Sequence, residues 1–235
     1  MTPVCDLVLP CRDEGPALPA VLAGVPAGFR VIVVDNGSRD DTAAVAAAHG
    51  ARVVVEQTPG YGSAVHAGVL AATAPYLAVA DGDGSFDLAQ LRGLLALVTG
   101  GGATMAVGRR RPRGRRTWPW HARAGNVVLS AWLRRATSLD LHDIAPMRVC
   151  RRQDLLELGV RDRRFGYPLE LLLRAGDAGW RVVEVDVDYL PRAAGTRSKV
   201  SGSVRGTARA VLDFAKVTST VRAELSRKRS ATVAA

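Results

Sequence analysis

Residues 79–87 read VADGDGSFD, so three carboxylates fall within seven residues directly after the apolar run APYLAVA. A calcium-binding EF-hand loop that began at Asp81 would need glycine at its sixth position and glutamate at its twelfth. This chain has Phe86 and Arg92 at those two positions. The apolar run is typical of a buried strand. The aspartates are therefore expected at the end of a strand, not in a calcium loop between helices.

Asp81 and Asp83 are two positions apart, so an extended backbone directs both carboxylates to the same side, roughly 6.6 Å apart at about 3.3 Å per residue. Such a pair can hold one hard cation while water and substrate supply its other ligands. Mg²⁺ is usually held in this way beside phosphate oxygens. The alternative is an acidic turn that caps the helix expected to begin near Asp87.

The composition of the chain predicts one globular domain with at most a small appendage. It has 235 residues, of which 48% are apolar, and no apolar run that approaches 18 residues, so no membrane-spanning helix is expected. The N-terminal sequence MTPVCDLVLP has no basic leader, so we expect no signal peptide. Cys5, Cys11 and Cys150 lack zinc-ligand spacing and are odd in number, which favours a reducing, cytoplasmic setting.

Positive charge is concentrated in two segments of a chain whose net charge is +10. Residues 109–139 hold nine arginines and no acid, and residues 189–235 hold ten Lys or Arg against two acids. Such segments attract anions, so a phosphorylated substrate, an acidic membrane surface and nucleic acid are all candidates. The run RRRPRGRRTWPWH, residues 109–121, is predicted to form an exposed loop.

Strand and helix patterns alternate through the first half of the chain. Strands are expected near residues 4–10, 29–35, 51–56, 76–81 and 103–108, with helices between them. Near-continuous apolar strands joined by helices are typical of a parallel sheet that is covered on both faces. Ligands of such sheets bind beyond the carboxyl ends of the strands. Asp35 and the Asp81–Asp83 pair fall at such ends and are expected to meet in space.

The second half is expected to hold two more strands and three helices. The helices are predicted over residues 121–137, over residues 168–179 and from about Ser203, with a short strand in APMRVCRR and a longer one in RVVEVDVDYL. We expect one domain over residues 1–222 and a basic tail of disordered composition over residues 223–235.

A series of stretches resembles the successive motifs of family 2 glycosyltransferases of the GT-A fold. They are, in order, LVLPCRDEGPAL, VIVVDNGSRDDT, GYGSAVHAGV, VADGDGSFD and MAVGRR. The later HDIAPMRVCRR, FGYPLELLLRAGDAGWRVVEVDVDY and GTRSKVSGS resemble the subgroup related to dolichyl-phosphate mannose synthase and bacterial polyprenyl-phosphate sugar synthases. The resemblance covers about residues 4–222. It implies a Rossmann-like, mostly parallel sheet with helices on both faces.

The resemblance also implies a reaction and its participants. A sugar would move from a UDP- or GDP-sugar to a phosphate acceptor, most simply a polyprenyl phosphate, with inversion at the sugar carbon. Asp81 and Asp83 match the DxD pair of the family and would hold Mg²⁺ or Mn²⁺. The other donor-binding residues would be Pro10, Asp13, Glu14, Asp35 and Gly62. The acceptor or diphosphate would be neutralised by Arg109, Arg148, Arg197 and Lys199, and Asp83 and Arg109 would be catalytic. Where the family usually has asparagine, this chain has Asp13.

Several of these residues have a structural alternative. Asp35 could only cap the turn that follows it, and Arg148 could pair with Asp143 inside the fold. The glycine-rich helix start that contains Gly62 could serve backbone packing. Glu170 is the candidate general base if the acceptor is a hydroxyl group. Its alternative is a carboxylate in a helix salt bridge.

A lipid-phosphate acceptor would place the protein at the inner face of the plasma membrane. Basic segments 109–123 and 197–229 could hold it there peripherally, at about 1 kcal/mol for each Lys or Arg near an anionic surface. One rival function is a glycosyltransferase with a small hydroxyl acceptor, and another is a nucleic-acid-binding α/β protein that uses its arginine-rich face. Nucleic acid is not expected, because an acidic strand-end site in the same crevice would repel a polyanion.

Overall fold

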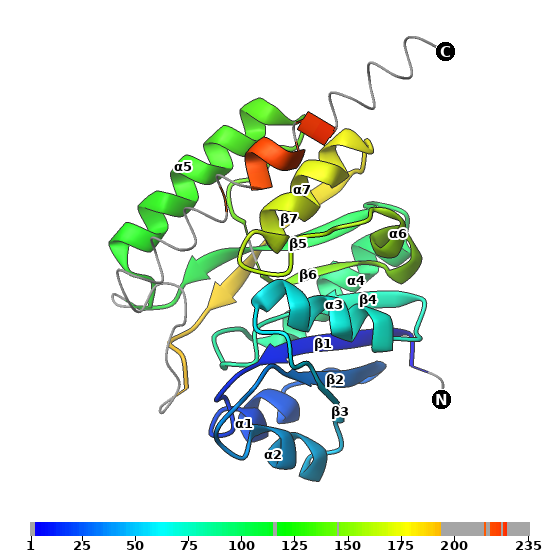
Figure 1. Cartoon of the computed structure of the whole chain (residues 1–235), viewed down its shortest axis with the longest axis vertical. Helices are drawn as coiled ribbons and strands as arrows, with labels where there is room; N and C mark the ends of the chain where they lie inside the picture. The colour runs from blue at the N-terminus through cyan, green and yellow to red at the C-terminus, as the bar shows by residue number, and fades with distance from the viewer. Residues whose placement is uncertain are drawn as a thin grey trace.

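The computed structural model describes residues 3–114, 117–144, 146–193, 214, 217–221 and 223–224. Within them, the strands form one seven-stranded sheet in the order β3-β2-β1-β4-β6-β5-β7 (Figure 1). In this sheet β6 runs antiparallel to both neighbours and all other pairs are parallel. The mostly parallel α/β sheet predicted from the sequence is confirmed. The strands span Cys5–Cys11 (β1), Phe29–Asp35 (β2), Arg52–Val55 (β3), Tyr76–Val79 (β4), Met105–Pro112 (β5), Arg148–Arg151 (β6) and Val182–Tyr189 (β7).

Helices cover both faces of the sheet because successive side chains of a strand point to opposite faces. Leu7 and Leu9 of β1 face one set of helices, whereas Val8 faces the other. The first set is α1 (Leu18–Ala23), α2 (Thr42–Ala48) and α4 (Leu91–Thr99), with the short 3₁₀ turn η1 (Leu88–Gln90) before α4. The second set is α3 (Tyr61–Ala71), α5 (Trp120–Ala136), α6 (Arg152–Glu157) and α7 (Tyr167–Asp177).

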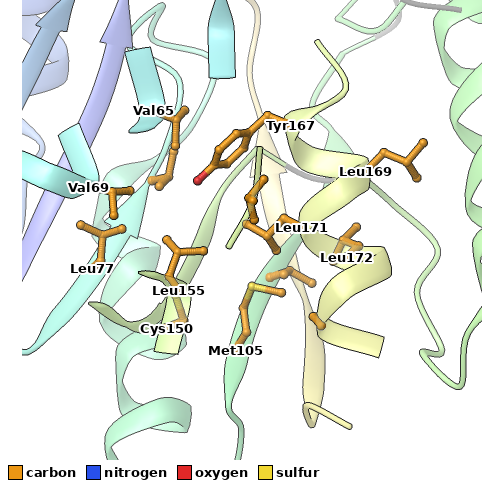
Figure 2. Packing of buried hydrophobic residues seen from close by; sticks show 14 of the residues in the cluster. Val65, Val69, Leu77, Met105, Cys150, Leu155, Tyr167, Leu169, Leu171 and Leu172 are labelled. Carbon is orange, nitrogen blue, oxygen red and sulfur yellow. The ribbon is translucent and has the colours of Figure 1, made fainter. Parts of the chain in front are cut away.

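The helix α7 is buried along most of its length. Figure 2 shows its Tyr167 and Leu171 directed towards Val65 and Val69, which belong to the same core cluster. Every residue from Leu169 to Ala175 is buried, including the charged Glu170 and Arg174. Because buried charges are costly unless they are paired, each of these two side chains must have a partner.

The strand β5 continues further than the sequence predicted. Residues 109–112, expected in a loop, extend β5 to Pro112 and pair with residues 186–189 of β7. The prediction was wrong because the acids that compensate these arginines lie 75 or more residues later in the chain, at alternate positions of β7. The ion pairs are Arg109–Glu184 (3.9 Å), Arg111–Asp186 (2.8 Å) and Arg113–Asp188 (2.7 Å).

The C-terminal region contributes a short helical segment to the domain. Residues 217–221 are helical, and Val217 and Val221 are buried in the core cluster that α3 and α7 share. Apart from Phe214, the remainder of the helix expected from Ser203 lies outside the described residues, as does the predicted tail 223–235 apart from Ala223 and Glu224. Across the described ranges, no helix combines the length and the apolar character needed to cross a bilayer.

Gly68 sets how closely α3 lies against the sheet. An added Cβ would collide with Val8 and lie 3.1 Å from Cγ2 of Val34. Gly68→Ala is therefore expected to lower the free energy of unfolding by about 1–3 kcal/mol, because overpacking outweighs the better helix propensity of alanine. Urea denaturation measures the change. The matched control is Gly93→Ala in α4, where an added Cβ meets nothing within 4 Å; it should be neutral or stabilising. Equal stability of Gly68→Ala and the parent would contradict the close packing.

Candidate active site

A cavity of about 780 Å³ lies where the carboxyl ends of the parallel strands meet. The start of β6 reaches the same edge, because this strand runs in the opposite direction. Polar and charged side chains from five separate segments line this cavity, which is the arrangement expected for a ligand site of an open α/β sheet. These residues are Glu14 after β1, Asn36 after β2, Asp81 and Asp83 after β4, Arg110 of β5 and Arg192 after β7.

Asp81 and Asp83 both line the cavity, as the sequence predicted. Asp83 is buried; its Oδ1 accepts a hydrogen bond from the Ser85 backbone N–H (2.9 Å), and its Oδ2 lies 2.9 Å from Nη1 of Arg192. Burial and the neighbouring Asp83 charge raise the pKa of Asp81 to about 7, although Arg192, Arg110 and Arg148 oppose the shift. Two carboxylates thus share a poorly solvated space in which a second negative charge is unfavourable.

This pair suits a hard divalent cation. Carboxylate oxygens are the ligands that Mg²⁺ and Mn²⁺ prefer, and a cation would relieve the repulsion between the two groups. The part of the chain that the structure describes contains no cluster of three or more His, Cys, Asp or Glu side chains that could enclose a metal. The remaining ligands would therefore have to be water and substrate oxygens, as is usual for Mg²⁺ beside phosphates.

Arg110, and not the predicted Arg109, faces the cavity. Neighbouring residues of a strand point to opposite sides, so Arg109 lies on the other face of β5 with Glu184. The guanidinium of Arg110 donates from Nε and Nη2 to Asp143 (2.9 and 2.6 Å) and stacks 4.0 Å from the ring centre of Trp118. The expectation that Arg109 faces the site is thereby wrong, and Arg110 is the arginine of β5 that lines the cavity.

The other predicted cations have different positions. Arg148 is buried on β6, where its Nε donates to the Pro146 carbonyl (3.3 Å) and its charge acts on Asp81. Its suggested partner, Asp143, is bound by Arg110. Arg197 and Lys199 lie outside the described residues. Arg192, which the sequence reasoning missed, is the cation that contacts Asp83.

Besides Asp81 and Asp83, two of the predicted donor-binding residues line the cavity, Pro10 and Glu14. The carboxylate of Asp13 accepts from the Arg39 backbone N–H (2.7 Å), and Asp35 accepts from that of Ser38 (3.0 Å), so both stabilise the adjoining loops. Gly62 is buried beneath the segment that precedes α7, where an added Cβ would lie 2.7 Å from the Asp162 carbonyl oxygen. For Asp35 and Gly62 the structural alternatives of turn capping and backbone packing are therefore observed.

Glu170 does not line the cavity. Its carboxylate is buried and accepts hydrogen bonds from the backbone N–H groups of Arg161 (3.0 Å) and Asp162 (2.6 Å) and from Nε of Arg174 (2.7 Å). Nη2 of Arg174 also donates to Glu224 (2.9 Å). A carboxylate with three donors and no access to the cavity anchors a loop, so the assignment of Glu170 as a general base is corrected to the salt-bridge alternative.

The cavity also has a large apolar wall, which the sequence did not predict. Much of this wall comes from α5, which the sequence predicts as a helix. The position of this helix beside the aspartates depends on the tertiary fold. The wall contains Trp118, Ala122, Val128, Leu129, Trp132, Ile144, Phe165, Pro168 and Phe214.

Comparisons with known proteins agree with this geometry. The family model described as Glycosyl transferase family 2 matches residues 6–159. An uncharacterized glycosyltransferase of Mycobacterium tuberculosis is 63% identical over 213 residues, which cover 91% of this chain and 97% of that protein. A dolichyl-phosphate hexose transferase of Haloferax volcanii is 33% identical over 81% of this chain and 85% of its own length. Among solved structures, glucosyl-3-phosphoglycerate synthase of M. tuberculosis in complex with Mn²⁺, UDP and glucosyl-3-phosphoglycerate has a TM-score of 0.72 at 22% identity, covering 93% of this chain and 80% of the other.

The raised pKa of Asp81 predicts how stability depends on pH without metal. Between about pH 4 and pH 7 the folded protein binds this proton and the unfolded chain releases it, so stability should fall as pH rises through that window. In EDTA at pH 8, Asp81→Asn is expected to be more stable than the parent by up to roughly 4 kcal/mol, about 8–16 °C in Tm. The difference should vanish near pH 4. The exposed Asp140→Asn is the control, and an equal Tm of Asp81→Asn and the parent at pH 8 would refute the shift.

Proposed function

This chain belongs to glycosyl transferase family 2, and we propose that it transfers a sugar from a UDP- or GDP-sugar to the phosphate of a polyprenyl phosphate. The observation that carries the proposal is that one cavity combines a group of charged side chains with a large apolar wall. A sugar nucleotide needs the first and an isoprenoid chain the second. The name of the H. volcanii relative, a dolichyl-phosphate hexose transferase, supports the same acceptor class.

The donor is assigned to the aspartate end of the cavity. Asp81 and Asp83 would hold Mg²⁺ or Mn²⁺, which would supply Lewis-acid stabilisation of the charge that develops on the departing diphosphate. Arg192, beside Asp83, adds a fixed positive charge at the same place. Such preorganised charges stabilise a transition state more than the ground state because the leaving group gains charge as the bond breaks.

The acceptor phosphate is assigned to the space beside Arg110. One of its oxygens attacks the anomeric carbon of the sugar, a new carbon–oxygen bond forms, and the bond to the β-phosphate oxygen breaks on the opposite face with inversion. A phosphate monoester has a second pKa near ~6, so at neutral pH it is already an anionic nucleophile and no proton needs to be removed. The role of Glu170 as a loop anchor is consistent with this chemistry, because a general base is not required.

The rival small hydroxyl acceptor has less support. Such an acceptor needs a general base, and Glu170, the candidate for that role, is engaged outside the cavity. It would also leave the apolar wall without a function. The similarity to glucosyl-3-phosphoglycerate synthase, at 22% identity, concerns the fold alone.

The acceptor class also suggests contact with a membrane, through α5. Its first half exposes Trp120 (80%), Val127 (56%) and Val128 (70%), and its charged residues are exclusively basic. A helix with exposed apolar residues, an N-terminal tryptophan and no acid suits the interface of an anionic bilayer. Val128 also lines the cavity, so a lipid chain that leaves the cavity along this helix would enter the bilayer directly.

Transfer assays with a panel of sugar nucleotides, Mn²⁺ and a polyprenyl phosphate test the proposed reaction. Asp83→Ala is expected to lower kcat by about 100-fold or more and to abolish Mn²⁺-dependent stabilisation by UDP or GDP. Arg110→Lys should raise the acceptor KM, since lysine cannot keep the bidentate contact with Asp143. Arg109→Lys is the matched control and should be near normal. Full activity of Asp83→Ala would remove the metal assignment, and transfer to phosphoglycerate but to no lipid phosphate would favour the small-acceptor rival.

Vesicle flotation tests the membrane contact. Val127→Asn combined with Val128→Asn is expected to lower the affinity for phosphatidylglycerol vesicles by about tenfold or more, because each buried valine contributes roughly 1.5 kcal/mol. Leu70→Asn, an exposed apolar residue of α3, is the control and should bind like the parent. Equal binding of all three proteins would show that α5 does not enter the lipid surface.

A further inference from the structure

The hydroxyl group of Tyr61 lies in an unusual environment. Tyr61 is the first residue of α3 and lines the cavity. Its hydroxyl oxygen is shielded from solvent and has no hydrogen-bond partner among the described residues. Buried polar atoms are nearly always paired, and one that is not carries a cost in stability. Because the residue that carries this hydroxyl lines the cavity, a ligand bound there is the candidate partner.

The surroundings of this hydroxyl favour an anion. Burial raises the pKa of Tyr61, so the group stays protonated and acts as a hydrogen-bond donor. The positive charges of Arg148 and Arg110 lower the pKa of Tyr61, whereas the negative charge of Asp81 raises it. In the part of the chain that the structure describes, Nη1 of Arg110 has no hydrogen-bond partner, because Asp143 and Asn126 engage only Nε and Nη2. Tyr61 and Arg110 belong to two different elements, line the same cavity and each have a donor that is not used within the described residues.

The tyrosine is also held firmly in position. The first N–H groups of α3 donate to the segment before α7, from Gly62 to the Arg164 carbonyl (3.1 Å) and from Ser63 to that of Arg163 (2.9 Å). Glu170 in turn fixes this segment through the Arg161 and Asp162 backbone N–H groups. The backbone that carries Tyr61 is therefore preorganised, and little backbone freedom is lost when a ligand binds.

We propose that the Tyr61 hydroxyl donates a hydrogen bond to the phosphate of the acceptor, which lies beside Tyr61 and Arg110, and that Glu170 is the positioning residue for this contact. The assignment to the acceptor rests on the proposed function. It follows from the position of Arg110, whose guanidinium contacts Trp118 and Asn126 on the apolar side of the cavity, whereas Arg192 lies with Asp83 on the donor side.

Tyr61→Phe separates this role from a structural one. Without ligand, the variant should be as stable as the parent or more stable, because it removes a buried hydroxyl that has no partner. Its KM for a polyprenyl phosphate should rise about tenfold or more, as expected for the loss of a hydrogen bond to a charged group, while the Kd for UDP or GDP with Mn²⁺ stays unchanged. Tyr76→Phe is the control, because Tyr76 lies at the start of β4, at the opposite end of that strand from Asp81. This variant should leave both constants unchanged.

Two results would overturn the proposal for Tyr61. One is an unchanged acceptor KM, and the other is a clear loss of stability, which would reveal a structural partner for the hydroxyl. If the parent transfers sugar to no lipid phosphate, the proposed function fails, and inorganic phosphate becomes the probe for Tyr61. It should then raise the Tm of the parent more than that of Tyr61→Phe, and equal shifts would refute the contact independently of transfer.

Glu170→Gln tests the positioning role. Both carboxylate oxygens of Glu170 accept hydrogen bonds from backbone N–H groups, whereas the amide of glutamine has only one acceptor oxygen. The segment at residues 161–162 should therefore become less firmly held. Hydrogen exchange at the Gly62 and Ser63 amides should become faster and the acceptor KM should rise, with the pH dependence of kcat unchanged. Normal exchange at these amides, or a lower kcat with an altered pH profile, would overturn the positioning role, and the second result would restore Glu170 as a base.

Discussion

The repulsion between Asp81 and Asp83 at the end of β4 is the constraint on which the rest of the site depends. Two carboxylates in a poorly solvated space are stable only if positive charge surrounds them. Arg192, Arg110 and Arg148 supply that charge, and they come from the exit of β7, from β5 and from the start of β6. The charges of the site therefore follow the order of the strands β4, β6, β5 and β7 across the sheet. A cation or an anionic substrate that enters changes this balance directly.

The same principle explains the arginine run of β5. Read along the chain, residues 109–139 contain nine arginines and no acid, which favours an exposed loop that binds a polyanion. In space, the residues on one face of the strand pair with acids of β7, and Arg110 on the other face pairs with Asp143. Exposed ion pairs of this kind add little stability, but they reduce the field that a nucleic acid would meet. The nucleic-acid rival thereby loses much of its physical basis, while α5 keeps its unopposed basic residues.

The fold and the position of the aspartates could be predicted from the sequence because both depend on short-range patterns. Apolar runs of strand length, spaced by helices, define the sheet, and a strand end places Asp81 and Asp83 at its carboxyl edge. The choice between Arg109 and Arg110 could not be made correctly, because it depends on whether β5 continues, and that depends on acids of β7. The structural role of Glu170 could not be predicted for a related reason: the sequence reveals a carboxylate on a helix but not the backbone N–H groups that surround it. The hydroxyl of Tyr61 gives no sequence signal, since its environment is assembled from three distant segments.

Part of the apolar wall lies beyond the family model, and this bears on how acceptor specificity can arise. The family model ends at residue 159, and the aspartates, Pro10 and Glu14 all lie within it. Phe165, Pro168 and Phe214 of the apolar wall lie beyond it, as does the Glu170–Arg174–Glu224 network that fixes the adjoining loop. A shared α/β sheet can thus present one nucleotide-sugar site while the later segments determine which acceptor reaches it, because function resides in sites added to a fold and not in the fold itself. In this chain those segments are apolar beside fixed cations, which is the combination that a phosphate with a hydrocarbon chain requires.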